Sequence, residues 1–152
     1  MSKEKQITVS RVIDQPAKDV FDTLSLPQRH PNFDGSGMVR SSENTERIQA
    51  VGDVFVMNMT GRTGNEYQTH NHVSAFDEGK MVGWKPALAE APDEVGGWEW
   101  LYTLEPNDAH STTVTLTYNW NDVTDKDLLA QLPLVSEEEL EQSLNLLASA
   151  LA

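Results

Sequence analysis

The feature that most constrains this fold is the alternation of large and small residues over positions 98–104. Alternate side chains of a strand share a face, so one face of this segment carries Trp98, Trp100, Tyr102 and Leu104. The segment 112–121 repeats the pattern, with threonines between larger residues. We therefore predict one sheet with an aromatic inner face and a polar outer face. The functional question is whether the inner face packs against protein or against a ligand.

The other predicted elements surround these two strands. A first strand is expected at 7–14, a helix from Pro16 to before Pro27, and a short second helix or turn within 25–37. Extended chain resumes at Met38, and further strands are predicted at 54–60, 66–76, 81–88, 98–105 and 112–121. The turns between these strands are short, which predicts an antiparallel meander.

The C-terminal region reads as helix. A short piece is predicted at 125–131, followed by a break at Pro133 and a new start at Ser136, where Glu139 completes a capping box. The apolar stripe of this helix consists of Leu140, Leu144, Leu147 and Leu151. Such a stripe requires a sheet to cover.

These elements predict an α+β domain, a curved antiparallel sheet of about seven strands wrapped around a C-terminal helix, with two short helices after the first strand. A helix on strongly bent strands cannot contact every inward side chain, so a cavity is expected between them. We expect a single domain over residues 1–152, because no Pro/Ser-rich linker divides the chain.

The order of elements resembles the helix-grip fold of the START/Bet v 1-like (SRPBCC) superfamily, specifically its polyketide cyclase/dehydrase-like group. The matching segments are 7–10 followed by 15–21, then 51–55, 82–84, 100–106 and the strand that ends at 118–120. The superfamily includes carriers, cyclases, hydrolases, toxins and chaperone regulators, so the resemblance implies a fold more than one function.

The composition excludes several function classes. The chain has no cysteine, which rules out disulfides, thiolate nucleophiles and Cys-ligated zinc. The net charge of −13 lies almost entirely in the C-terminal half, where Lys126 is the one basic residue after Lys85. An acidic surface repels phosphate, so nucleic acid is not an expected partner. We interpret the acidity as a source of solubility, and expect a monomer or weak dimer.

The opening sequence leads directly into a strand-like segment. No long apolar stretch precedes or follows it, which predicts neither a signal peptide nor a membrane span, and a cytoplasmic location.

The predicted cavity has an apolar wall with a few polar groups. Phe55, Met57 and Met59 share one strand face, and methionines suit an irregular apolar wall. The full set of predicted ligand-binding residues is Phe55, Met57, Met59, Tyr67, Asn71, Trp84, Trp100, Tyr102, Tyr118, Leu140 and Leu144. We expect binding of a small hydrophobic molecule that is aromatic, polyketide-like or lipid-like. The alternative is that these rings simply fill the core.

Two further functions stay open at this level. A polyketide cyclase/dehydratase, which the resemblance implies, would use Tyr102, Tyr118 or Asn71 to polarise a carbonyl while the cavity positions the chain. A protein-interaction module would have a packed interior and an exposed apolar patch. The sequence has no P-loop, dinucleotide fingerprint, Gly-x-Ser-x-Gly or His-Glu-x-x-His motif, and no cofactor is expected.

His70 and His72 form a His-x-His pair whose direction depends on hairpin register. A two-residue turn at Glu78-Gly79 places Val73 opposite Trp84 and turns both histidines to solvent. A three-residue loop reverses the assignment. We favour the first register because it buries more apolar surface, and we predict no metal site.

Two segments border the expected entrance to the cavity. Residues 85–97 contain two prolines and the Gly96-Gly97 pair, and residues 33–37 contain two glycines. Glycine pairs permit hinge motion. We nevertheless expect both segments to be ordinary solvent-exposed connections, because most loops do not control access to a binding site.

Overall fold

The computed structural model describes residues 5–43 and 46–152. The strands are β1 (Gln6–Ile13), β2 (Val39–Ser42), β3 (Val54–Thr60), β4 (Glu66–Asp77), β5 (Met81–Leu88), β6 (Glu99–Asp108) and β7 (Ser111–Asn119). The helices are α1 (Ala17–Leu24), the 3-10 helix η1 (Pro27–Phe33), α2 (Lys126–Leu129) and α3 (Glu137–Leu151). One antiparallel sheet has the order β1-β7-β6-β5-β4-β3-β2.

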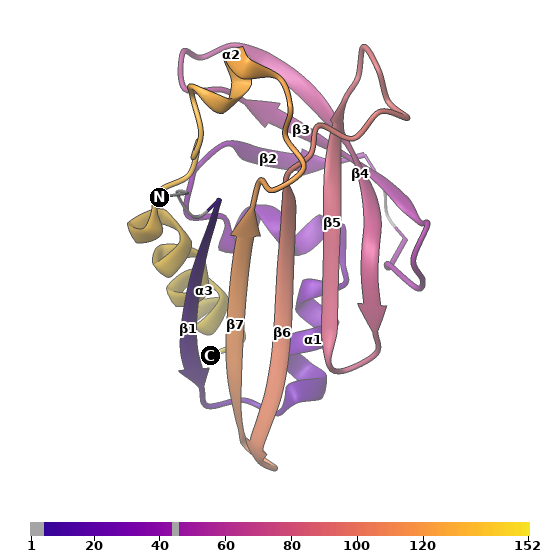
Figure 1. Cartoon of the computed structure of the whole chain (residues 1–152). Coiled ribbons are helices and arrows are strands. Elements are labelled where there is room, and N and C mark those ends of the chain that lie inside the picture. The colour runs from indigo at the N-terminus through magenta and orange to yellow at the C-terminus, as the bar shows by residue number, and fades with distance from the viewer. Residues whose placement is uncertain (1–4, 44–45) are drawn as a thin grey trace.

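The sheet curls around the helices. In Figure 1, β1, β7, β6 and β5 run side by side, whereas β2 and β3 turn across their direction at one end. Helices α1 and α3 lie behind this sheet, and α3 packs against β1 and η1. This arrangement is the helix-grip fold, which confirms the predicted fold class.

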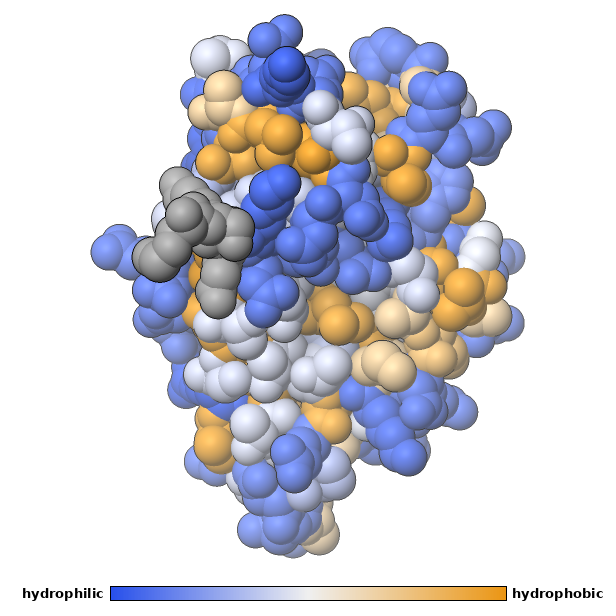
Figure 2. Space-filling model, viewed as in Figure 1, coloured by the Kyte–Doolittle hydropathy of each residue, from blue (hydrophilic) through white to orange (hydrophobic). Residues whose placement is uncertain are grey.

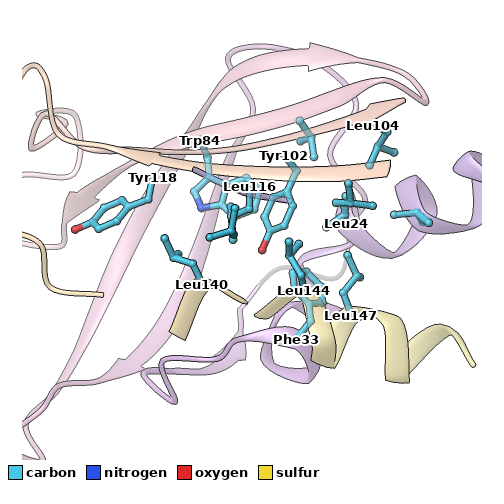
Figure 3. Packing of buried hydrophobic residues seen from close by; sticks show 14 of the residues in the cluster. Leu24, Phe33, Trp84, Tyr102, Leu104, Leu116, Tyr118, Leu140, Leu144 and Leu147 are labelled. Atoms are coloured by element: carbon cyan, nitrogen blue, oxygen red, sulfur yellow. The ribbon is translucent and has the colours of Figure 1, made fainter. Parts of the chain in front are cut away.

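The core forms where the two helices meet the sheet. Val20, Phe21 and Leu24 of α1 are buried, as the predicted apolar side of that helix requires. From α3, Leu140, Leu144 and Leu147 are almost fully buried. Figure 3 shows these three leucines rising from α3 toward side chains that descend from the sheet. Each buried leucine contributes about 1.5–3 kcal/mol to folding.

Helix α3 begins at the predicted capping box. The Ser136 hydroxyl accepts a hydrogen bond from the Glu139 amide at 3.2 Å, and Glu139 Oε1 accepts one from the Ser136 amide at 3.0 Å. Two amides without helical partners are thereby satisfied. The start of α3, and hence the phase of its leucine stripe, follows from these two residues.

The turn between β6 and β7 differs from the sequence expectation. The strand predicted at 98–105 should end before Pro106, but β6 continues through Pro106 to Asp108, with a bulge between these two residues. Strand β5 pairs with β6 at residues 100–103. Beyond that point β6 is an edge strand, where the missing amide of Pro106 removes no ladder bond.

The β4–β5 hairpin reaches the favoured register by a different route. The turn is not the predicted two-residue one, because Asp77 pairs with Met81 and leaves three residues in the loop, with Gly79 at φ 79°. A bulge between Val73 and Ala75 then shifts the pairing, so that Val73 lies opposite Trp84. The inward face of β4 is therefore as predicted up to Val73.

The convex face of the sheet is polar. Figure 2 shows this face mostly in blue and near-white, with scattered orange residues. Cross-strand hydroxyl contacts follow β1 and β7, with Ser10 Oγ 2.9 Å from Thr115 Oγ1 and Thr8 Oγ1 3.5 Å from Thr117 Oγ1. Among the described helices, none is both long and apolar enough to cross a bilayer.

Candidate functional site

A cavity of about 960 Å³ lies between the curled sheet, η1 and the N-terminal part of α3. Ten of the predicted binding residues line it: Phe55, Met57, Met59, Tyr67, Asn71, Trp84, Trp100, Tyr102, Tyr118 and Leu140. Leu144, the remaining predicted residue, does not line it. It is buried in the hydrophobic core, one helical turn beyond Leu140 on α3.

The wall of the cavity from β3 and β4 combines apolar and amide groups. Phe55 and Met57 are buried and Met59 is half-buried, so their face of β3 points inward as expected. On β4, the Asn71 amide nitrogen donates to the Phe55 carbonyl at 3.2 Å and to Thr69 Oγ1 at 3.2 Å. These bonds hold the carboxamide of Asn71 in one orientation.

Stacked aromatic rings from β5, β6 and β7 form the side of the cavity that lies against the sheet. The Trp100 and Tyr118 rings lie 4.1 Å apart, with planes inclined by only 7°. Farther in, the Trp84 and Tyr102 rings are 6.0 Å apart and inclined by 29°. Figure 3 shows Trp84, Tyr102 and Tyr118 projecting from the sheet, with the Tyr102 hydroxyl directed toward α3. Rings fixed in this way offer flat surfaces without further ordering of side chains.

The buried tyrosines stay protonated at physiological pH. Burial raises the pKa of Tyr118 to about 12, although a hydrogen bond from the Leu134 amide opposes this shift. Burial raises the pKa of Tyr102 still further, and the nearby Asp34 carboxylate acts in the same direction. Each phenol is therefore a hydrogen-bond donor.

His30 is a polar member of the inner lining residues that the sequence pattern did not predict, a group that also includes Phe33 and Leu116. His30 belongs to η1, is fully buried, and lines the cavity. Its ring stacks on Trp84 at 4.8 Å and meets the rings of Phe33 and Phe55 edge-on, each at 5.3 Å. A 3-10 turn has no two-residue alternation that would show an inward direction. The available signal was a histidine between Pro27 and Pro31 in a segment otherwise read as a turn.

The mouth of the cavity has an apolar rim and a two-bond ion pair between Arg62 and Glu139. Leu88, Val95 and Leu134 line the cavity and are large exposed apolar residues. Arg62 Nη1 and Nη2 donate to the two carboxylate oxygens of Glu139, both at 2.8 Å. The ion pair raises the pKa of Arg62 and lowers that of Glu139. It ties the β3–β4 turn to the start of α3.

The two predicted entrance segments also border the mouth. Residues from both 85–97 and 33–37 line the cavity. The longer segment is anchored by a bridge between Ala87 and Val95 and by a hydrogen bond from the Gly96 amide to the Pro86 carbonyl at 3.1 Å. These contacts make it a folded connection at the rim.

His70 and His72 lie on the other face of β4. Thr69, Asn71 and Val73 are buried, and the two histidines alternate with them. The ring of His72 contacts the Pro92 carbonyl through Nε2 at 2.6 Å. Within residues 5–43 and 46–152, no group of three His, Asp or Glu side chains has the geometry of a metal site.

Sequence comparison relates this chain to a known protein over only part of that protein's length. No protein-family model matches the chain. "Uncharacterized protein Rv0088" of Mycobacterium tuberculosis is 29% identical over 115 residues, which cover 74% of this chain and 47% of that protein. The chain thus spans about half the length of this relative.

Solved structures share the architecture at low sequence identity. Protein Ms6760 from Mycobacterium smegmatis has a TM-score of 0.70 and 17% identity, covering 97% of this chain and 91% of its own. Protein NE0264 from Nitrosomonas europaea has a TM-score of 0.70 and 16% identity, with 99% and 96% covered. Ginseng major latex-like protein 151 from Panax ginseng has a TM-score of 0.61 and 14% identity, with 97% of each chain covered.

These likenesses concern the fold. Sequence identities below one fifth establish no shared activity. Together with the curled seven-stranded sheet and its C-terminal helix, they show that this chain has a helix-grip fold of the Bet v 1-like kind.

Proposed function

We propose that this protein binds a small, ring-containing, mostly apolar molecule in the cavity between the sheet and α3. The observation that carries the proposal is the cavity itself, which lies beside the stacked rings of Trp100 and Tyr118. In contrast, the buried residues of α1 and of the rest of α3 belong to the packed core. The cavity volume of about 960 Å³ lies at the upper end of the range typical of small-molecule sites.

The chemistry of the lining supports a flat ligand. Trp84, Trp100 and Tyr118 present ring faces or edges, and Met57 and Met59 supply adaptable apolar contacts. A stacked ring pair contributes roughly 0.5–1.5 kcal/mol beyond the burial of its area. The exposed apolar rim gives such a ligand a first contact at the mouth.

The polar groups of the lining orient the ligand in this proposal. Tyr102 and Tyr118 carry their protons at neutral pH, so neither phenol acts as a base, and Asn71 is held by β3 and β4. A function as an interaction module would require a packed interior, and the open cavity favours the small-molecule function over it.

A neutral fluorescent probe tests the proposal. N-phenyl-1-naphthylamine should show saturable fluorescence enhancement with the wild-type protein, because an apolar cavity excludes water from its rings. Met59→Trp fills the cavity from β3 and should abolish the enhancement. Val12→Trp adds the same ring on the exposed face of β1 and should leave it unchanged. Absence of binding by wild type, or equal binding by Met59→Trp, would overturn the proposal.

A further inference from the structure

The buried side chain of His30 in the cavity wall has one lone pair that no described protein group uses. Nε2 of His30 lies 2.7 Å from the carbonyl oxygen of Leu24. A carbonyl oxygen only accepts, so Nε2 carries the proton of this bond. In the neutral ring Nδ1 then has a lone pair, and burial, which lowers the pKa of His30 to about 4, keeps the ring neutral.

The ring geometry leaves Nδ1 as the nitrogen that can reach the cavity. The two nitrogens of an imidazole point to different sides of the ring, and Nε2 points toward the end of α1. The bond to Leu24 is the one hydrogen bond of His30 within the described residues. In that part of the chain, the fully buried side-chain polar atom that lacks a partner is Arg29 Nε, so Nδ1 has access to the open volume that His30 lines.

The position of the acceptor is fixed by packing on several sides. Trp84 stacks on one face of the imidazole, and Phe33 and Phe55 contact it edge-on. A buried acceptor that cannot move costs free energy unless a donor reaches it. The donor must come from what occupies the cavity.

Tyr102 defines the same end of the cavity. Trp84 stacks on both His30 and Tyr102, and Phe33 contacts both rings. The Tyr102 hydroxyl makes no hydrogen bond to another described residue and lies in the space that Figure 3 shows between the sheet and α3. One acceptor and one donor therefore lie close together at the inner end of the cavity.

The charges near this end disfavour an anionic ligand. The Asp34 carboxylate lines the cavity and acts electrostatically on both His30 and Tyr102. Arg62, the cation at the mouth, is already paired with Glu139. Among the described residues that line the cavity, a fatty-acid carboxylate would find no free cation at this end, and it would meet a negative neighbour.

Building on the proposed function, we infer that His30 Nδ1 is the acceptor for a hydroxyl of the ligand, so that the cavity selects neutral hydroxylated aromatic molecules over carboxylates. The hydroxyl donates to Nδ1, and the aromatic body lies against the rings of Trp84 and Trp100. His30 is a specificity-determining residue in this arrangement.

Three naphthalene probes of similar size test the inference: 2-naphthol, 2-methylnaphthalene and 2-naphthoate at neutral pH. Affinities are measured by tryptophan fluorescence for wild type, for His30→Phe, which keeps a ring of similar size, and for His110→Phe, which changes a histidine at the exposed β6–β7 turn. The affinity ratio of 2-naphthol to 2-methylnaphthalene should fall about tenfold in His30→Phe. It should stay unchanged in His110→Phe, and 2-naphthoate should bind most weakly to wild type.

A measurement on the wild type keeps the test decisive if His30→Phe does not fold. The ¹⁵N resonance of Nδ1 should move upfield when 2-naphthol is added, because an unprotonated imidazole nitrogen is more shielded when its lone pair accepts a hydrogen bond. It should stay in place with 2-methylnaphthalene, which has no hydroxyl to donate.

The outcomes separate the two proposals. Equal binding of 2-naphthol and 2-methylnaphthalene with an unmoved Nδ1 resonance would overturn the inference while leaving the proposed function intact. Strongest binding of 2-naphthoate would also overturn it. Failure of all three probes would count against the proposed function itself.

Discussion

The imidazole of His30 and the indole of Trp84 lie nearly parallel, with ring centroids 4.8 Å apart and planes inclined by 19°. One ring comes from the 3-10 helix after α1, and the other from the middle of β5. The contact joins the connection after α1 to the concave face of the sheet. It also buries a titratable group, which gives the protein a pH-dependent stability.

We predict that the free energy of unfolding decreases as the pH falls from about 6.5 toward 4. The folded-state pKa of His30 is lowered to about 4 from an ordinary value of 6.5. Between these two pH values the imidazole is protonated in the unfolded chain and neutral in the folded chain, so the unfolded state is favoured as the pH falls. The loss from this group is about 3 kcal/mol over the full range. Urea unfolding at pH 7, 5.5 and 4.5 measures it.

The matched control for this pH effect is His30→Phe. Its stability should change less than that of wild type between pH 6.5 and 4.5. The same pH dependence in both proteins would show that His30 is not the responsible group. A ring-proton NMR titration in which His30 becomes charged near pH 6.5 would contradict the prediction directly.

Substitutions of Tyr118 should separate the ring from its hydroxyl. The ring is buried and stacked on Trp100 at 4.1 Å, whereas the hydroxyl accepts a single long bond of 3.4 Å from the Leu134 amide. We expect Tyr118→Phe to cost less than about 1 kcal/mol of stability. Tyr118→Ala should cost about 3–5 kcal/mol, by analogy with other buried aromatic truncations. Equal losses in chemical denaturation would mean that the stack contributes little.

Removal of the Arg62 guanidinium should weaken the contact between the β3–β4 turn and the start of α3. Arg62→Met loses two bonds to Glu139 and one to the Leu134 carbonyl, each 2.8 Å long. The pair is partly exposed, so we expect a loss of about 1 kcal/mol or less at low salt. Lys18→Met, an exposed change on α1, is the control and should have no effect.

The salt dependence provides the sharper readout for Arg62. In 1 M NaCl the Debye length is about 3 Å, so the stability difference between wild type and Arg62→Met should shrink. A difference that is independent of salt would show that the arginine acts through packing instead of charge.

Two nearby glycines should respond very differently to alanine. A Cβ at Gly35 would lie 2.2 Å from the Glu139 carbonyl oxygen and 2.8 Å from the Ser143 nitrogen, both backbone atoms of α3. Gly35→Ala therefore has to move the loop after η1 away from α3, and we expect a loss of about 2–3 kcal/mol. Gly37 has open space around it and a φ of 77°, so Gly37→Ala should cost only about 1 kcal/mol.

Thermal unfolding of the two glycine variants tests this comparison. The melting temperature of Gly35→Ala should fall well below that of Gly37→Ala. The reverse order would mean that the close approach of residue 35 to α3 does not hold in solution.

The sequence predicts which side chains of a strand share a face, because alternation along a strand is a local rule. Side chains alternate across a strand, so Phe55 with Met57, and Trp100 with Tyr102, had to share a face wherever the strands lay. The start of α3 was equally local, since Ser136 and Glu139 satisfy each other's backbone amides. These features gave the helix-grip fold class and most of the cavity wall.

Tertiary structure alone decided the rest. The bulge after Val73, the continuation of β6 through Pro106 and the placement of Leu144 in the core depend on how neighbouring elements pair and pack, which the pattern of a single segment does not contain. His30 is the clearest case, because its burial arises from the path of η1 beneath Trp84 and from a carbonyl freed at the end of α1. The local pattern around His30 says only that the chain turns. The Tyr102 donor at the inner end of the cavity could be predicted from strand alternation, whereas the His30 acceptor beside it became evident only in the folded chain.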